Sequence, residues 1–198
     1  LQREFPELES LSGKTLLEVG CGVGNLVFPM WESCSDVRII CADFAKTAID
    51  IIKADPRYSQ GRIEAHVHDF TQGPLHVEGS IDLVTMIFVL SAVPPEKQAQ
   101  FFHNLRDTGV KLILFRDYAF EDAAQKRFAE SNKLSEELFV RQDGALAYYF
   151  TVEHLRAVAG EAGFEVVDAT IVQSQTVNMK EDLRVDRRFL QCRLVSKN

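Results

Sequence analysis

Short apolar runs alternate with amphipathic stretches along the chain from residue 15 onward. The apolar runs have the length of buried strands, and the amphipathic stretches have the length of helices. Strands are predicted at residues 15–20, 37–43, 62–69, 81–88 and 110–117, and helices at residues 25–34, 44–53 and 95–105. Alternating strands and helices are typical of βαβ units, whose strands run parallel. The pattern therefore predicts an α/β fold built on a mostly parallel sheet.

The alternation changes after the fifth predicted strand. The elements expected there, in chain order, are a polar helix at residues 121–134, a hairpin at 138–150, a helix at 151–162 and strands at 164–177 and 188–195. Asp143-Gly144 is a typical hairpin turn, and Gly163 is a suitable end for the helix before it. Two strands joined without a helix run antiparallel. We expect a seven-stranded sheet with an antiparallel C-terminal strand and an inserted β-hairpin.

Composition narrows the class of protein. Apolar residues make up 46% of the chain and charged residues 26%, the balance of a globular protein in water. The net charge of −7 argues against a freestanding nucleic-acid binder, because Lys and Arg supply most non-specific affinity for phosphates. The C-terminal stretch is much more basic, with Lys180, Arg184, Arg187, Arg188, Arg193 and Lys197. A local basic surface therefore remains compatible with an anionic partner.

Neither a membrane span nor a metal site is expected. No apolar run approaches the roughly 20 residues that cross a bilayer. His66 and His68 share one face of a predicted strand, but apart from Asp69 no Cys or carboxylate completes a metal site there. The cysteines lack CxxC spacing, which favours a reducing intracellular compartment. They are Cys21, Cys34, Cys41 and Cys192.

The strongest chemical signal is a glycine-rich turn between the first predicted strand and helix. Gly20, Gly22 and Gly24 allow a ligand to lie against the backbone, as in nucleotide-binding α/β proteins. A NAD site is the obvious alternative. Two details favour S-adenosylmethionine: Glu18 can satisfy an ammonium group, and Asn25 stands where a dinucleotide site has its third glycine.

Further candidates follow the next predicted strands. Asp43 lies about twenty residues past the glycines, where a carboxylate can accept both ribose hydroxyls. Asp69 is placed to bind the adenine amino group, with the aromatic Phe70 alongside. We include Phe44 among the cofactor residues and expect Ile87 to close the apolar side of the pocket. Each alone is more often a helix cap or core residue, but together they predict a nucleoside site at the carboxyl ends of the strands.

Several blocks of sequence resemble the methyltransferase-like enzymes that make 3-methylcytidine in the anticodon loop of tRNA. They are residues 3–8 (REFPEL), 18–25 (EVGCGVGN), 87–92 (IFVLSA), 115–118 (FRDY), 139–144 (FVRQDG), 176–178 (TVN) and 189–191 (FLQ). The FRDY and FVRQDG blocks are the most specific. The resemblance implies a single Rossmann-like methyltransferase domain over residues 1–198. The N-terminal tRNA-binding segment of the family is expected to be absent from this chain.

The resemblance also implies a reaction and its residues. S-adenosylmethionine would methylate N3 of a tRNA cytidine, leaving S-adenosylhomocysteine. Asp117 is the candidate partner of the exocyclic amine, Phe88 and Tyr118 are candidates to stack on the base, and Arg116 and Arg141 to hold phosphate or the base carbonyl. Gln142 and Arg187 complete the candidate substrate residues. Seryl-tRNA synthetase or another helper protein, and a cytoplasmic or also nuclear location, belong to the same expectation.

Three alternatives stay open from the residues themselves. The acceptor could be a small metabolite or a protein side chain, in keeping with the acidic balance. The chain could be a non-catalytic subunit that binds the cofactor. Arg116 and Asp117 could be a structural ion pair bracing the hairpin, with Asp143-Gly144 only its turn.

Overall fold

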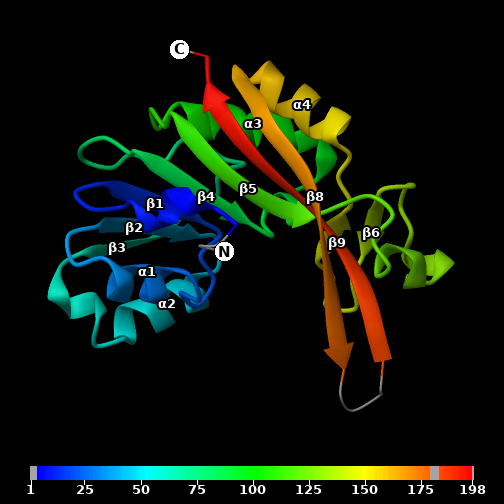
Figure 1. Ribbon diagram of the computed structural model, residues 1–198, viewed down its shortest axis with the longest axis horizontal. Coiled ribbons are helices and arrows are strands. Elements are labelled where there is room, and N and C mark those ends of the chain that lie inside the picture. Colours follow the sequence, from blue (N-terminus) through cyan, green and yellow to red (C-terminus); the bar gives the residue numbers. More distant parts are fainter. Residues whose placement is uncertain (1–3, 179–182, 198) are drawn as a thin grey trace.

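The computed structural model describes residues 4–178 and 183–197, which form a seven-stranded sheet and a separate two-stranded one (Figure 1). The strands of the large sheet are, in spatial order, β3 (Ile63–Val67), β2 (Arg38–Asp43), β1 (Thr15–Val19), β4 (Leu83–Ile87), β5 (Leu112–Tyr118), β9 (Leu183–Ser196) and β8 (Phe164–Asn178). All run parallel except β9, which is antiparallel to both of its neighbours. The predicted α/β fold with one antiparallel C-terminal strand is confirmed.

Helices cover both faces of this sheet. They are α1 (Val27–Ser33), α2 (Lys46–Ala54), α3 (Pro95–Arg106) and α4 (Val152–Glu161). Alternate side chains of β1 enter two hydrophobic clusters: Leu16 packs with the apolar sides of α1 and α2, and Leu17 packs with those of α3 and α4. Successive residues of a strand point to opposite faces, so a central strand buried on both sides is almost wholly apolar. This burial explains why β1, β2 and β4 read as apolar runs, whereas the edge strand β3 alternates buried and partly exposed residues.

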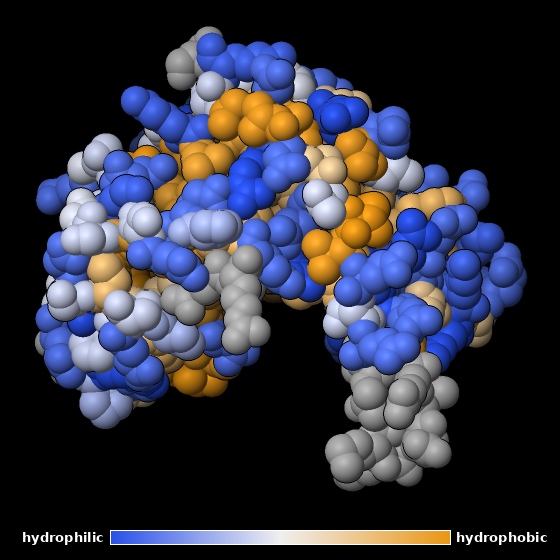
Figure 2. Space-filling view, viewed as in Figure 1, coloured by the Kyte–Doolittle hydropathy of each residue, from blue (hydrophilic) through white to orange (hydrophobic). Residues whose placement is uncertain are grey.

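The last two strands form a long antiparallel hairpin that extends beyond the other strands (Figure 1). Strand β9 begins at Leu183, earlier than the predicted 188, because pairing with β8 continues along the projecting arm. Figure 2 shows hydrophobic side chains gathered over the β8–β9 strands on the side away from the hairpin tip, and β8 exposes Val167 and Ile171. In this view the surface is hollowed between the projecting part of the β8–β9 hairpin and the part of the molecule that carries α1 and α2.

The segment between β5 and α4 is where the structure departs from the predicted elements. The inserted hairpin is present as β6 (Leu138–Val140) and β7 (Leu146–Tyr148). The predicted helix at 121–134 is wrong: only the short 3₁₀ turns Gln125–Arg127 and Glu130–Asn132 form. Glu121 has a φ of +64°, which no α-helix accepts, and the Asp122 carboxylate bonds the backbone N–H groups of distant Arg188 and nearby Ala124. Tertiary contacts therefore hold this segment in turns.

Three further 3₁₀ turns are present, at Pro6–Glu9, Tyr58–Gln60 and Leu90–Ala92. Within residues 4–178 and 183–197, no helix has both the length and the apolar character needed to cross a membrane.

Candidate functional site

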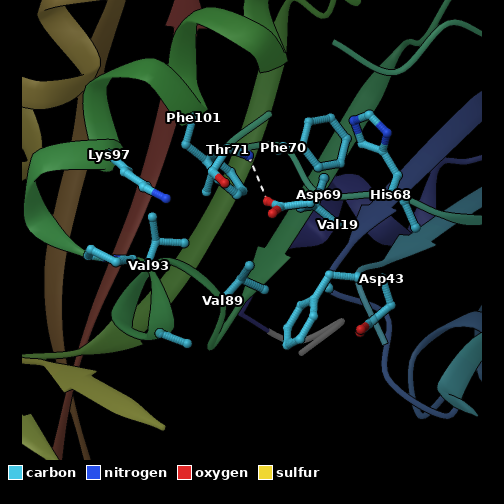
Figure 3. Close-up of a pocket in the computed structure, with 15 residues that line it drawn as sticks. Val19, Asp43, His68, Asp69, Phe70, Thr71, Val89, Val93, Lys97 and Phe101 are labelled. Atoms are coloured by element: carbon cyan, nitrogen blue, oxygen red, sulfur yellow. Dashed lines mark hydrogen bonds between the residues drawn. The ribbon is translucent and has the colours of Figure 1, made fainter. Parts of the chain in front are cut away.

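A pocket of about 250 Å³ opens at the carboxyl ends of the parallel strands (Figure 3). Its walls come from the last residues of β1 and β2, from the residues that follow β1, β2, β3 and β4, and from the first two turns of α3. The lining residues include the predicted Gly20, Asp43, Phe44, Asp69 and Phe70. Parallel α/β sheets bind ligands at this edge because several strands end there together. The structure thus brings together residues that the sequence places in three different strand-end segments.

The glycine turn is shaped for close approach to its neighbours. Gly20 has a φ of +65°, and a Cβ added to it would lie 2.5 Å from Cγ2 of Val89. The backbone N–H of Gly22 donates to Oδ2 of Asp43 at 2.9 Å, and Oδ1 of Asp43 accepts from the N–H of Ala45 at 2.8 Å. Asp43 therefore fixes the turn while its carboxylate still faces the pocket, since each oxygen has two lone pairs.

Glu18 is a buried carboxyl group with an unmet hydrogen bond. The side chain is 6% exposed, and among the described residues its Oε2 has no partner. Burial raises the pKa of Glu18 to about 8; the Val27 N–H opposes this shift, and the negative charge of Asp43 adds to it. A cationic group beside Glu18 would supply the missing partner. The ammonium group of S-adenosylmethionine meets this requirement, and Gly20, two residues further along the chain, lines the pocket.

Donor binding should depend on pH through Glu18. The ligand ammonium lowers the pKa of the carboxyl group, so binding below about pH 8 releases its proton and affinity rises with pH. We expect roughly a tenfold gain in affinity for S-adenosylhomocysteine between pH 6 and 7.5. Calorimetric titration in two buffers of different ionisation enthalpy measures both affinity and proton release. Glu18→Gln should flatten the dependence, and an equal slope in that variant would assign it to another group.

The adenine end of the pocket is formed by Asp69 and its neighbours. Oδ1 of Asp69 accepts the N–H of Thr71 at 2.8 Å (Figure 3). Burial alone would raise the pKa of Asp69, but hydrogen bonds from Thr71 and Gln72 and the charge of Lys97 lower it, which favours the carboxylate. Lys97 reaches the pocket from α3. Sequence reasoning missed Lys97, because periodicity alone does not show which side of a helix meets a strand-end pocket.

Two aromatic side chains that line the pocket differ in their exposure to solvent. Phe70 is 3% exposed and meets the ring of His68 edge-on, with centroids 4.6 Å apart. Phe44 also lines the pocket but is 76% exposed. A large apolar side chain left in water at a pocket mouth is suited to covering a flat ligand.

Four of the predicted cofactor residues lie outside the pocket lining: Glu18 and Gly22, which flank the lining residue Gly20 in sequence, and Asn25 and Ile87. Ile87 packs on the opposite face of β4, against the cluster beside α1 and α2, and does not line the pocket. Strand alternation turns it away, and Val89 and Val93 supply the apolar wall instead. Asn25 is exposed in the turn before α1 and also lies outside the pocket lining.

The turn of residues 88–93 is held rigidly from within the core. Gln98 is fully buried, and its Nε2 donates to the carbonyl oxygen of Leu90 at 3.4 Å and to that of Val93 at 3.1 Å. Its Oε1 lies 2.7 Å from Nε2 of His154 on α4. These contacts connect α3 and α4 to a wall of the pocket, and the sequence pattern contained no sign of them.

A group of aromatic side chains packs around Phe88, the first residue of this turn. We call Phe88, Tyr118, Tyr149 and Phe189 the aromatic cluster. The ring centroids of Phe88 and Tyr118 are 5.2 Å apart, as are those of Phe88 and Phe189, and those of Tyr118 and Tyr149 are 5.6 Å apart. Phe88 is 40% exposed and has a φ of +57°, a conformation that side chains rarely adopt. Such strain is typical of functional sites.

Two predicted arginines border the aromatic cluster. The guanidinium carbon of Arg187 lies 5.4 Å from the ring centroid of Tyr118 and 5.3 Å from that of Phe189. The Arg116 guanidinium lies 4.8 Å from the Phe189 centroid and forms an ion pair with Glu4. The interpretation of Arg116 and Asp117 as an ion pair is therefore wrong, because neighbouring residues of β5 point to opposite faces.

Asp117 is fully buried below the 88–93 turn. Its Oδ2 accepts the N–H of Ser91 at 2.9 Å, and its Oδ1 accepts the N–H of Tyr118 at 2.9 Å. Burial raises the pKa of Asp117 to about 6, although the hydrogen bonds from Ser91 oppose the shift. In this geometry Asp117 positions the turn that carries Phe88. Its contact with a substrate amine stays a prediction.

The remaining predicted substrate residues lie apart from the pocket. Arg141 and Gln142, at the β6–β7 turn, line an open hollow with Arg127, Phe128 and other residues of the inserted segment. Arg141 forms an ion pair with Asp143 at 3.4 Å. Among the residues that the structure describes, no group of three or more His, Cys, Asp or Glu side chains could hold a metal ion.

Comparison with known proteins adds relatives of this chain. Residues 16–108 match a family model described as a methyltransferase domain. The chain is 43% identical to the rat tRNA N(3)-cytidine methyltransferase METTL6, over 96% of this chain and 69% of that protein. It is 42% identical to the tRNA N(3)-methylcytidine methyltransferase trm141 of Schizosaccharomyces pombe, over 96% of this chain and 82% of that protein.

Solved structures share the fold at low sequence identity. A SAM-dependent methyltransferase from Methanosarcina mazei superposes with a TM-score of 0.73 at 16% identity, over 97% of both chains. The magnesium protoporphyrin IX methyltransferase of Synechocystis, solved with bound SAM, gives a TM-score of 0.62 at 15% identity, over 97% of this chain and 76% of that one.

Proposed function

Because this chain belongs to the tRNA N(3)-cytidine methyltransferase family, we propose that it transfers a methyl group from S-adenosylmethionine to N3 of a cytidine in tRNA. The structural observation that carries the proposal is the 88–93 turn. Val89 on this turn lines the cofactor pocket, and the adjacent Phe88 belongs to the aromatic cluster. A donor in the pocket and a base on the cluster would therefore be neighbours, and positioning is what this reaction requires.

The donor side is served by residues already described. S-adenosylmethionine supplies an electrophilic methyl group on a positively charged sulfur. Glu18 would hold its ammonium group, Asp43 its ribose hydroxyls and Asp69 its adenine amine, with Phe44 covering the base. The tight contact of Gly20 with Val89 keeps this wall of the pocket in place.

The acceptor side requires no base. N3 of cytosine has a free lone pair at neutral pH, so no proton is removed before attack. The methylated ring carries a positive charge, and the faces of aromatic rings stabilise cations. Arg116 and Arg187 would oppose that charge if they were unpaired, but Glu4 and Asp122 balance them. The aromatic cluster is therefore suited both to stacking on a base and to tolerating its charge.

The proposal is tested by incubating the protein with S-adenosylmethionine and unmodified tRNA, with and without seryl-tRNA synthetase, and quantifying methylated nucleosides by mass spectrometry. We expect 3-methylcytidine, and roughly a hundredfold slower formation in Phe189→Ala with donor binding retained. Tyr58→Ala, a partly buried aromatic outside the aromatic cluster, is the matched control.

The outcomes separate the open alternatives. Methylation of a protein or a small molecule in place of tRNA would move the assignment to those substrates. Donor binding without any methyl transfer would favour a non-catalytic subunit. A requirement for a helper protein and a cytoplasmic or nuclear location stay predictions of the family resemblance, as does the assignment of residues 1–198 to one methyltransferase domain.

A further inference from the structure

We infer that Asp122 is a positioning residue that fixes the Arg187 guanidinium on the aromatic cluster. Asp122 is completely buried, and it lies in the segment where sequence patterning predicted only a polar helix. The inference rests on the proposed function, because it assigns a task to a residue bordering the proposed base site.

The Asp122 carboxylate accepts hydrogen bonds from one distant segment, Arg187 and Arg188, and from nearby Ala124. Nε of Arg187 donates to Oδ1 at 3.0 Å and to Oδ2 at 3.1 Å. The backbone N–H of Arg188 donates to Oδ2 at 2.5 Å, and that of Ala124 to Oδ1 at 2.7 Å. A buried carboxylate needs such partners to offset the loss of water, so its geometry is closely defined.

This arrangement uses only one of the three nitrogens of Arg187. Among the described residues, no hydrogen bond occupies its two terminal nitrogens, and its side chain is 22% exposed. The guanidinium plane is held on one edge by Asp122 and lies near the rings of Tyr118 and Phe189. The terminal N–H groups are thus pre-positioned to donate to a carbonyl oxygen of a stacked pyrimidine, a task for which a fixed planar donor is better suited than a flexible one.

The adjacent acid provides a matched control. Glu121 forms an ion pair with the neighbouring arginine, Arg188, at 2.7 Å, but its side chain is 56% exposed. Exposed ion pairs contribute little to stability. The chain therefore offers two consecutive Glu/Asp–Arg pairs, of which only the Asp122–Arg187 pair is buried and touches the aromatic cluster.

A double-mutant cycle in the full-length protein tests the inference. We expect Asp122→Asn to lower kcat/KM for tRNA roughly thirtyfold, mainly through kcat, with KM for S-adenosylmethionine unchanged. In an Arg187→Ala background, the same change should cost less than about twofold, because its effect passes through Arg187. Glu121→Gln should stay within about twofold of wild type. Losses that multiply in the double variant, or an equal loss in Glu121→Gln, would overturn the inference.

A measurement on the unmodified chain covers the case in which Asp122→Asn does not fold. Nitrogen-15 NMR should show the Arg187 Nε–H protected from solvent exchange, unlike that of Arg127, for which no ion pair is found among the described residues. Rapid solvent exchange of the Arg187 Nε–H would show that Asp122 does not hold this guanidinium, and would overturn the inference. Failure of the wild-type protein to methylate tRNA would instead reject the proposed function, and the NMR result would still judge the contact.

Discussion

Gly20→Ala is expected to abolish measurable donor binding and to lower the free energy of unfolding by about 2–4 kcal/mol. Two effects combine at this position. The added Cβ would lie 2.5 Å from the Val89 side chain, and the φ of +65° is costly for alanine. Relief of the contact requires the 88–93 turn to move, which displaces a wall of the pocket. Denaturant unfolding and calorimetric titration with S-adenosylhomocysteine measure the two losses.

Gly13→Ala separates strain from collision. Gly13 has nearly the same φ, +69°, but a Cβ there would meet nothing within 4 Å. This variant should lose only about 1 kcal/mol and bind the donor normally. If the two alanine variants lost equal stability and both bound the donor, the close approach of Gly20 to Val89 would not be needed for donor binding.

Asp117→Ala is expected to slow methyl transfer by roughly a hundredfold or more, with a smaller loss of donor affinity. The substitution leaves the buried N–H groups of Ser91 and Tyr118 without acceptors, at a cost of about 1–3 kcal/mol each. The freed turn no longer holds Phe88 in its strained conformation. Single-turnover methylation and donor titration should be measured on the same preparation. Equal losses in both would place Asp117 on the donor side alone.

Asp117 also predicts an unusual pH dependence of stability. Its pKa is raised from 3.8 in the unfolded chain to about 6 by burial. Between these values the folded protein binds a proton that the unfolded chain has released, so the free energy of unfolding falls as pH rises from 4 to 6. The expected loss over this range is about 2 kcal/mol. Asp117→Asn, which cannot ionise, should remove it.

Glu18 must be controlled in that experiment. Its pKa is raised in the same direction, to about 8, so it also lowers stability as pH rises. Unfolding should therefore be compared between Glu18→Gln and the Glu18→Gln, Asp117→Asn double variant. A stability that rises from pH 4 to 6 in the first variant, or an identical decline in both, would contradict the assignment to Asp117.

The sequence by itself determined the parallel sheet and the location of the cofactor pocket. Strand and helix periodicity is a local property, and the glycine turn, Asp43 and Asp69 each follow an apolar run directly. Because parallel strands end at one edge of a sheet, the position of these residues in sequence was enough to place them together in space. The sequence did not determine the direction of single side chains. Ile87 points away from the pocket, whereas Val89, two residues further along the chain, forms part of its wall.

Only the tertiary structure decided the contacts between segments remote in sequence. Arg116 pairs with Glu4, Arg187 with Asp122 and Gln98 with His154, and each pair joins residues separated by at least 56 positions. Local periodicity carries no information about such partners. The polar run at 121–134 matched a helix as a pattern, but the structure holds it in turns, with the buried Asp122 carboxylate hydrogen-bonded to Arg187 and Arg188. Its partners exist only after β9 has packed beside β5.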